Sequence, residues 1–539
     1  TYMCTASIGP GSLNMVTGAA LATTNRLPVL LFPSDQFATR VPDPVLQQLE
    51  DPTSLDVSVN DAFRPVSRFF DRINRPEQLI PSLLNAMRVL TDPAETGAVT
   101  VAMPQDVQAE VFDWPVEFFR KRVWHVRRPV PEPAALERAV ALIKAAKRPL
   151  IIAGGGTIYA GASEELRALA TATGIPVGDT QAGKGAINFD HPSAVGGVGS
   201  TGCDSGNHIA DKADLIIGVG TRYSDFTTAS KTQFKNPDVK FVNINVTPFD
   251  AAKESAEMVV ADAREALAAL TEALADYHVD QAYSDEITAE KEAWLKATER
   301  CYHLDHGPLP AQTEVFGALN ELMGEEDVVI NAAGSMPGDL QALWQARSPL
   351  QYHVEYAFSC MGYEVPAAMG VKLARPEAEV VSIVGDGTYQ MLPMELATVV
   401  QENIKVIYVL LQNYGFCSIG ALSESRGSQR FGTKYRQRGE GSHLADEQVI
   451  DGVDIAVNAR SWGLDVLEVH TIEEFKEAYR KAEASDRPTM IHIETDLYGP
   501  NPPGSSWWDV PVSGVSALES TQRAYEDYQR DRKPQRHYL

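Results

Sequence analysis

The chain has 539 residues, of which 44% are hydrophobic and 22% charged, the composition of an ordinary globular protein. Its formal net charge of −25 argues against a nucleic-acid partner, which would require a basic patch. No apolar run reaches about 18 residues, so the sequence predicts no membrane-spanning helix. Five scattered cysteines without a CxxC pair indicate reduced thiols, and we therefore expect a cytoplasmic protein.

The first predicted domain spans residues 1–115 and alternates strands with helices. We predict strands at 2–5, 27–32 and 97–103, and helices at 13–23 and 76–90. Alternation of this kind is typical of a parallel sheet that is covered by helices on both faces. Because Thr1 stands inside what reads as a strand, we expect the domain to lack an N-terminal part.

A proline-rich stretch, 127–133, predicts a boundary between domains. A second α/β domain is predicted over 134–275, a third over 311–495, and a tail with a charged helix over 496–539. The predicted fold is therefore α/β, with three doubly wound parallel sheets. Strands of the second domain are expected at 149–153, 176–177, 215–220 and 241–245, and a helix at 137–146.

Polar side chains follow two buried strands of the third domain, which we predict at 380–384 and 405–411 with one helix, about 388–402, between them. Asp386 follows the first strand and Asn413 follows the second. Because the carboxyl ends of parallel strands meet at one edge of a sheet, the two side chains can point at one spot.

A carboxylate from Asp386, an amide oxygen from Asn413 and a loop carbonyl form an all-oxygen site suited to Mg²⁺. Gly385 and Gly387 let the backbone approach a ligand closely. The helix expected to begin near Thr388 offers free N–H groups to a phosphate. The stretch therefore predicts a site for a magnesium-bound diphosphate.

The spacing of this stretch also resembles a known family. Gly385-Asp386-Gly387, then 24 residues (388–411), then Gln412-Asn413 resembles the signature of the thiamine diphosphate enzymes, with Gln412 in place of the first of two asparagines. The resemblance implies bound thiamine diphosphate and Mg²⁺. The metal ligands it implies are Asp386, Asn413 and the carbonyl of Gly415. The cofactor-binding residues it implies are Gly334, Ser335, Met361, Gly385, Gly387, Thr388 and Asn413.

The resemblance also implies a large apolar residue that keeps the cofactor bent, at the place of Met361, and a glutamate that activates it. We expect that glutamate upstream of Thr1, so the catalytic residue is not among those that we can name. In this family the cofactor lies between two subunits, which implies a homodimer or a homotetramer.

Several stretches resemble, more narrowly, the family of 3D-(3,5/4)-trihydroxycyclohexane-1,2-dione hydrolases of myo-inositol catabolism. They are residues 25–31, 37–48, 60–68, 181–184, 220–226 and 333–340, and Trp507-Trp508. The resemblance implies C–C bond hydrolysis that opens the polyhydroxylated cyclic diketone to 5-deoxy-D-glucuronate. Two alternatives stay open: a carboligase or decarboxylase similar to acetohydroxy acid synthase, and an assembly protein that kept the fold without the chemistry.

Other polar residues have two interpretations each. Asp35, Gln36, Arg40 and Gln105 follow strands, and they either contact hydroxyl groups of a substrate or are ordinary loop residues. His353 and Glu355 are either acid–base groups or structural. Gly154-Gly155-Gly156 lacks the full dinucleotide pattern, which favours a tight turn. Trp507-Trp508 either forms a lid or covers the edge of a core.

Overall fold

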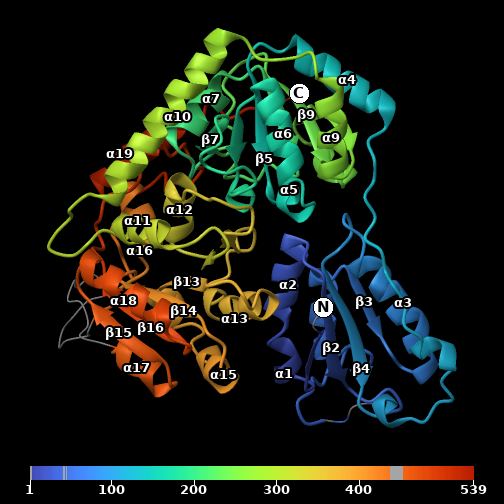
Figure 1. Cartoon of the computed structure of the whole chain (residues 1–539). Helices are drawn as coiled ribbons and strands as arrows, with labels where there is room; N and C mark the ends of the chain where they lie inside the picture. The colour runs from blue at the N-terminus through green and yellow to red at the C-terminus, as the bar shows by residue number, and fades with distance from the viewer. Residues whose placement is uncertain (1–2, 41–42, 44, 437–452, 539) are drawn as a thin grey trace. The chain divides into compact units, whose positions relative to one another are not determined.

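The computed structural model describes residues 3–40, 43, 45–436 and 453–538 (Figure 1). Tyr2, in the first predicted strand, and positions 41, 42 and 44 of the stretch 37–48 lie outside the described residues. The chain forms two compact units, Thr1–Arg128 and Pro129–Leu539, and their division falls within the proline-rich stretch 127–133. Within the described residues, no helix is both long and apolar enough to cross a membrane.

The first unit is built on a parallel sheet of four strands in the order β1-β2-β4-β3. The strands are β1 (Met3–Ala6), β2 (Val29–Asp35), β3 (Phe69–Arg72) and β4 (Ala98–Pro104). Its α-helices are α1 (Pro10–Leu13), α2 (Val16–Asn25) and α3 (Leu79–Leu90), and 3₁₀ turns lie at η1 (Val59–Val66), η2 (Pro76–Gln78), η3 (Val107–Ala109) and η4 (Val116–Phe119). Apolar residues of β4 are buried because the sheet is covered on both faces.

The second unit begins with a six-stranded parallel sheet, the central sheet, in the order β10-β9-β8-β5-β6-β7. Its strands are β5 (Pro149–Ala153), β6 (Val177–Asp179), β7 (Ala194–Gly197), β8 (Leu215–Val219), β9 (Lys240–Asn245) and β10 (Glu257–Val260). Its helices are α4 (Pro133–Ala145), α5 (Gly155–Tyr159), α6 (Ser163–Thr173), α7 (Asp204–Lys212), α8 (Pro248–Ala251), α9 (Ala263–Ala273) and α10 (Gln281–Tyr302), with short 3₁₀ turns at η5 (Gln181–Gly183) and η6 (Lys253–Ser255).

At Gly154 the chain turns directly from β5 into α5, whose first residues are Gly155 and Gly156, so the predicted tight turn is a strand-to-helix turn. A Cβ on Gly154 would lie 2.4 Å from the carbonyl oxygen of Gly220, and one on Gly156 would lie 2.8 Å from the Gly220 Cα. Backbone from the loop after β8 therefore fills the space beside this turn, which a nucleotide phosphate would need.

A second six-stranded parallel sheet, the third sheet, has the order β12-β11-β13-β14-β16-β15. Its strands are β11 (Val328–Asn331), β12 (Tyr352–Val354), β13 (Val380–Gly385), β14 (Ile407–Gln412), β15 (Asp465–Val469) and β16 (Thr489–Glu494). Its helices are α11 (Gln312–Leu322), α12 (Met336–Leu343), α13 (Glu364–Ala374), α14 (Asp386–Tyr389), α15 (Glu395–Gln401), α16 (Cys417–Ser425), α17 (Ile455–Ser461) and α18 (Ile472–Ala484).

The single helix predicted over 388–402 is wrong, because the structure has two helices there. The first, α14, begins at Asp386 and ends at Tyr389, and the second, α15, begins at Glu395. Pro393 lies between them, and a proline disfavours helical backbone in the residue before it. The connection between β13 and β14 therefore contains fewer helical residues and more turns than the sequence predicted.

The tail returns from the third sheet to the central sheet and contains α19 (Glu519–Asp531). The Trp508 indole N–H donates to Asp225 Oδ2 at 3.0 Å, and Ser506 Oγ donates to Gln233 Oε1 at 2.8 Å. Ser520 Oγ and Thr521 Oγ1 both donate to the Gly427 carbonyl, beyond α16. The tail is therefore packed against both sheets of the second unit, and the Trp507-Trp508 pair is part of that packing.

Candidate functional site

Asp386 and Asn413 meet at the carboxyl edge of the third sheet. Strands β13 and β14 are neighbours, with Gly385 paired to Leu411. The backbone N–H of Asn413 donates to Asp386 Oδ2 at 3.2 Å, and that of Tyr414 donates to the same oxygen at 2.6 Å. Gly387 N–H donates to Asp386 Oδ1 at 2.8 Å. The predicted juxtaposition of the two strand ends is confirmed.

The Asp386 carboxylate is only 1% exposed. Burial raises its pKa to about 6, while backbone N–H donors from Tyr414, Gly387, Asn413 and Gly415 oppose that rise. A buried carboxylate whose charge is stabilised by N–H groups alone gains further stabilisation from a cation at its remaining lone pairs. The electrostatics of Asp386 therefore favour a bound metal ion.

The residues present fit a magnesium ion. Asn413 Oδ1 is buried and has no hydrogen-bond partner among the described residues, so this amide oxygen can bind a cation. A Cβ on Gly415 would lie 2.3 Å from the Thr433 carbonyl oxygen, so the loop can follow this path only with glycine there. Within the described part of the chain no three His, Cys, Asp or Glu side chains gather as a metal site, so amide and carbonyl oxygens would have to complete this one.

The phosphate side of the site differs from the sequence-based expectation. The helix begins at Asp386, two residues before the predicted start near Thr388, and the Gly387 N–H is used by Asp386. The Thr388 hydroxyl donates to Glu364 Oε2 at 2.9 Å and accepts the Gly362 N–H at 2.6 Å. The Thr388 side chain is therefore committed to neighbouring protein groups, and only its backbone is left to meet a diphosphate.

Met361 lies in a turn whose backbone is fixed from both sides. Gly362 has a φ of +90°, and a Cβ there would lie 2.8 Å from the Leu392 Cβ, so both conformation and space require glycine. The Glu355 carboxylate accepts the N–H groups of Phe358, at 3.0 Å, and of Cys360, at 2.6 Å. Met361 itself is half-buried, which leaves part of its side chain to support a ligand.

Gly334 and Ser335 follow β11 and precede α12 at the same edge of the third sheet. Gly334 is exposed and has a φ of +94°, a conformation that favours glycine. The Ser335 hydroxyl donates to Gln312 Oε1 at 3.1 Å, and the Gln312 amide donates in turn to Asp339 Oδ2. Burial raises the pKa of Asp339 to about 7.

Glu364 is a buried member of this site that sequence reasoning did not assign. It begins α13, is 0% exposed, and accepts the Ala333 N–H at 3.2 Å as well as the Thr388 hydroxyl. Burial raises its pKa. The one signal in the sequence was a glutamate at the start of an otherwise apolar helical run.

Two other candidates are structural. The Glu355 carboxylate is 2% exposed and holds the Met361 turn, so its oxygens already have partners. His353 Nε2 is 2.7 Å from the Tyr363 hydroxyl, and burial lowers its pKa to about 4. His353 is therefore a neutral, hydrogen-bonded histidine rather than a group that exchanges protons near neutral pH.

Of the four polar candidates in the first unit, one differs from the other three. Asp35 is buried, and its Oδ2 accepts a 2.7 Å hydrogen bond from Arg72 Nε, so Asp35 belongs to a structural ion pair. Arg40 stacks on the Phe37 ring, with its Cζ 4.1 Å from the ring centroid, and Gln105 is exposed. Gln36 is different, because its Oε1 is buried without a partner among the described residues. Gln36 thus keeps an unused acceptor.

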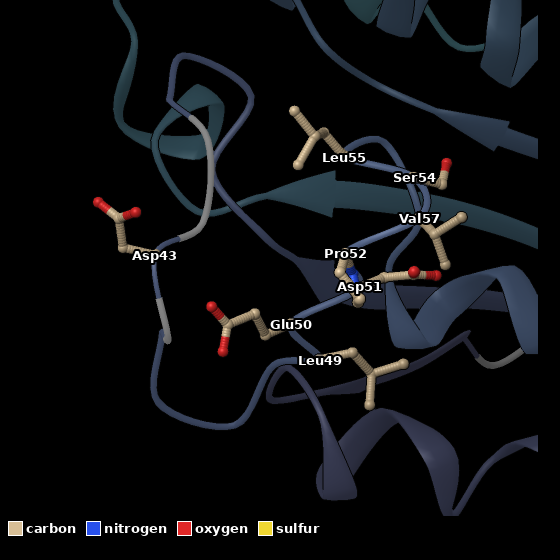
Figure 2. Close-up of a pocket in the computed structure, with 8 residues that line it drawn as sticks. All are labelled: Asp43, Leu49, Glu50, Asp51, Pro52, Ser54, Leu55 and Val57. Atoms are coloured by element: carbon tan, nitrogen blue, oxygen red, sulfur yellow. The ribbon is translucent and has the colours of Figure 1, made fainter.

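A hollow of about 380 Å³ lies in the first unit, beside the loop that follows β2 (Figure 2). Its lining residues are Asp43, Leu49, Glu50, Asp51, Pro52, Ser54, Leu55 and Val57. Three carboxylates would repel a diphosphate, and Asp51 Oδ1 already accepts the N–H and the hydroxyl of Thr53. This hollow is not the predicted cofactor site.

Two family models match the second unit. The model described as "Thiamine pyrophosphate enzyme, central domain" matches residues 136–270, which hold the central sheet. The model described as "Thiamine pyrophosphate enzyme, C-terminal TPP binding domain" matches residues 332–493, which hold the site described above. Thiamine pyrophosphate is the same compound as thiamine diphosphate.

Curated relatives match the chain almost end to end. The 3D-(3,5/4)-trihydroxycyclohexane-1,2-dione hydrolase of Bacillus cereus (strain AH820) is 46% identical over 97% of this chain and 85% of the relative. Hydrolases of the same name from Bacillus anthracis (strain CDC 684 / NRRL 3495) and Bacillus thuringiensis (strain Al Hakam) are each 46% identical over the same shares. The chain therefore belongs to the thiamine diphosphate enzymes, in the family of the 3D-(3,5/4)-trihydroxycyclohexane-1,2-dione hydrolases.

Proposed function

We propose that this chain is a thiamine diphosphate-dependent hydrolase that opens 3D-(3,5/4)-trihydroxycyclohexane-1,2-dione to 5-deoxy-D-glucuronate in inositol catabolism. The observation that carries the proposal is the relatives' 46% identity over 97% of the chain. The buried carboxylate and the free amide oxygen at the edge of the third sheet support it, because they supply the hard oxygen ligands that a magnesium-bound diphosphate needs.

In this proposal Asp386, Asn413 and the Gly415 carbonyl bind Mg²⁺, and Gly385, Gly387 and the Thr388 backbone receive the diphosphate. Gly334 and Ser335 line the same edge, and Met361 supports the ring end. When bound, thiamine diphosphate supplies a carbon nucleophile and an electron sink. The net reaction adds water across the C–C bond between the two carbonyl carbons, so that one becomes a carboxylate and the other an aldehyde.

The proposed function is tested by comparing two substrates. Purified protein with thiamine diphosphate and Mg²⁺ is incubated with the cyclic diketone or with pyruvate, and products are separated by chromatography. We expect 5-deoxy-D-glucuronate from the diketone and no acetolactate from pyruvate. Acetolactate without diketone opening would instead establish the acetohydroxy acid synthase alternative, and absence of both reactions in a protein that binds no cofactor would support the assembly-protein alternative.

Further parts of the proposal concern the assembled protein. We propose a homodimer or homotetramer in the cytoplasm, as the family resemblance implies. Size-exclusion chromatography with light scattering tests the first point, since an active monomer would contradict it. The four-stranded sheet of the first unit then serves the pyrimidine end of the cofactor.

A further inference from the structure

Glu364 joins three segments that the proposed function assigns to the cofactor. Its Oε1 accepts the Ala333 N–H at 3.2 Å, directly before Gly334. Its Oε2 accepts the Thr388 hydroxyl at 2.9 Å. Its backbone carbonyl accepts the Ser382 hydroxyl of β13 at 2.9 Å, which fixes the start of α13 to the sheet. A single buried side chain thus connects segments that lie 31 and 24 residues from it in the sequence.

The carboxylate of Glu364 also decides which way the Thr388 hydroxyl points. That hydroxyl accepts the Gly362 N–H at 2.6 Å, so its hydrogen has to point elsewhere. Glu364 Oε2 lies 2.9 Å from the Thr388 hydroxyl and accepts that hydrogen. Two hydrogen bonds therefore run in series as a chain, from the Gly362 N–H to the Thr388 hydroxyl and from that hydroxyl to the Glu364 carboxylate. Each of these groups has a partner.

This chain links the two ends of the proposed cofactor site. Gly362 follows Met361, which supports the ring end, whereas Thr388 follows the Gly385-Asp386-Gly387 turn at the diphosphate end. The Thr388 side chain bridges the two segments, and Glu364 holds that bridge. Movement of the Gly362 segment by a fraction of an ångström would disturb its bond to the Thr388 hydroxyl, which is short at 2.6 Å.

We propose that Glu364 is a positioning residue that, through the Thr388 hydroxyl, keeps the Met361 turn and the diphosphate turn at the spacing that thiamine diphosphate requires. The inference rests on the proposed function. Glu364 contacts neither substrate nor cofactor, and its effect falls on cofactor affinity rather than on the chemical step.

The test measures cofactor binding in four proteins: wild type, Glu364→Gln, Thr388→Val and the double variant. Glutamine keeps the shape of Glu364 but has one acceptor in place of two, so the Ala333 N–H and the Thr388 hydroxyl can no longer both be satisfied. Valine keeps the shape of Thr388 and removes its hydroxyl. Titration with thiamine diphosphate at saturating Mg²⁺, followed by tryptophan fluorescence and calorimetry, gives the affinity.

We expect each single variant to bind thiamine diphosphate about tenfold or more weakly, the size of effect that loss of a buried hydrogen bond produces. The double variant should be no weaker than the weaker single variant, because both changes break the same chain. The KM for the cofactor should rise in each single variant, a change that mere loss of folded protein would not produce.

Glu379→Gln is the matched control. Glu379 is a partly buried glutamate that precedes β13 at the opposite, amino edge of the same sheet and binds Lys405. We expect this variant to lose some stability and to keep its cofactor affinity. If Glu364→Gln fails to fold, Thr388→Val tests the proposal alone, because it removes the hydroxyl that Glu364 accepts.

Unchanged cofactor affinity in Thr388→Val, or losses in the two single variants that add in the double variant, would overturn the proposal. Failure of the proposed function looks different, since the wild-type protein itself would then not bind thiamine diphosphate.

Discussion

The backbone N–H of Tyr414 donates a 2.6 Å hydrogen bond to the carboxylate of Asp386, although the two residues are 28 positions apart in the sequence. The bond fixes the loop after β14 against the turn after β13. The same loop carries Asn413, whose buried Oδ1 has no partner among the described residues, so we propose that a metal ion would bind with little movement of the loop.

Asn413→Ala should weaken Mg²⁺ binding by about tenfold or more, because it removes an oxygen that can bind the cation and changes nothing in the carboxylate. Asp386→Ala should abolish Mg²⁺-dependent thiamine diphosphate binding. Calorimetric titration with Mg²⁺ and cofactor measures both. Asn320→Ala serves as the control, since Asn320 is also buried and donates to the Gln345 carbonyl, away from the site. Unaltered Mg²⁺ dependence in Asp386→Ala would refute the metal assignment.

Gly415→Ala should displace the loop that we propose binds the metal ion. The new Cβ would lie 2.3 Å from the Thr433 carbonyl oxygen, which cannot be accommodated without backbone movement. We expect a loss of about 1–3 kcal/mol in the free energy of unfolding and weaker cofactor binding. Gly370→Ala is the opposite case, because it lies in α13 with nothing within 4 Å of its Cβ position. That control should be neutral or slightly more stable in thermal unfolding.

Asp339→Asn should stabilise the protein at alkaline pH. Burial raises the pKa of Asp339 from 3.8 to about 7 in the folded protein. The stability that this proton contributes is present below pH 3.8 and is lost as the pH rises through about 7. Asparagine stays neutral and can still accept a hydrogen bond from the Gln312 amide, so the variant should exceed wild type by on the order of 4 kcal/mol at pH 8.

Thermal unfolding at pH 4, 6 and 8 measures this pH dependence. Equal stability differences between Asp339→Asn and wild type at all three pH values would contradict the raised pKa. The control is Asp465→Asn, because Asp465 forms a largely exposed ion pair with Arg487.

Lys184→Met should destabilise the second unit by about 3–5 kcal/mol, the usual cost of leaving a buried charge without its partner. Lys184 Nζ lies 3.3 Å from Asp179 Oδ2, and both side chains are almost fully buried. Burial raises the pKa of Asp179, so loss of Lys184 would favour a neutral carboxyl. The double variant Asp179→Asn/Lys184→Met should recover part of the loss in chemical denaturation, whereas an additive loss would show that the two groups are not coupled.

Sequence reasoning found most of the buried strands, but it did not predict β11 and β16 inside the third sheet, and it missed several strands at the edges. β5, β8, β13 and β14 lie inside their sheets and are continuous apolar runs, which is the pattern that predicts them. The edge strands β3, β10 and β12 have one neighbour each and are short and partly polar, so no pattern marks them.

The candidate site was predictable where its residues follow predicted strands. Asp386 and Asn413 each follow a predicted strand, so pairing the two strands in parallel is enough to place them close together. Glu364 was not predictable, because its partners Ala333 and Thr388 come from two other segments and only the folded chain shows their approach. The start of α14 was misplaced because the helix follows β13 directly: Gly385 is its N-cap and Asp386 its first residue.

The tail has a consequence for how the second unit unfolds. The chain passes from the central sheet to the third sheet through α10, and the tail brings it back to bind Gln233 and Asp225. Ser520 and Thr521 then bind Gly427, and the Tyr538 hydroxyl donates to the Gln233 carbonyl back at the central sheet. Because the tail is bound to both sheets, neither can unfold without disturbing the other. Although two family models describe this unit, its thermal denaturation should be one cooperative transition, and the amide protons of both sheets should exchange with solvent at similar rates.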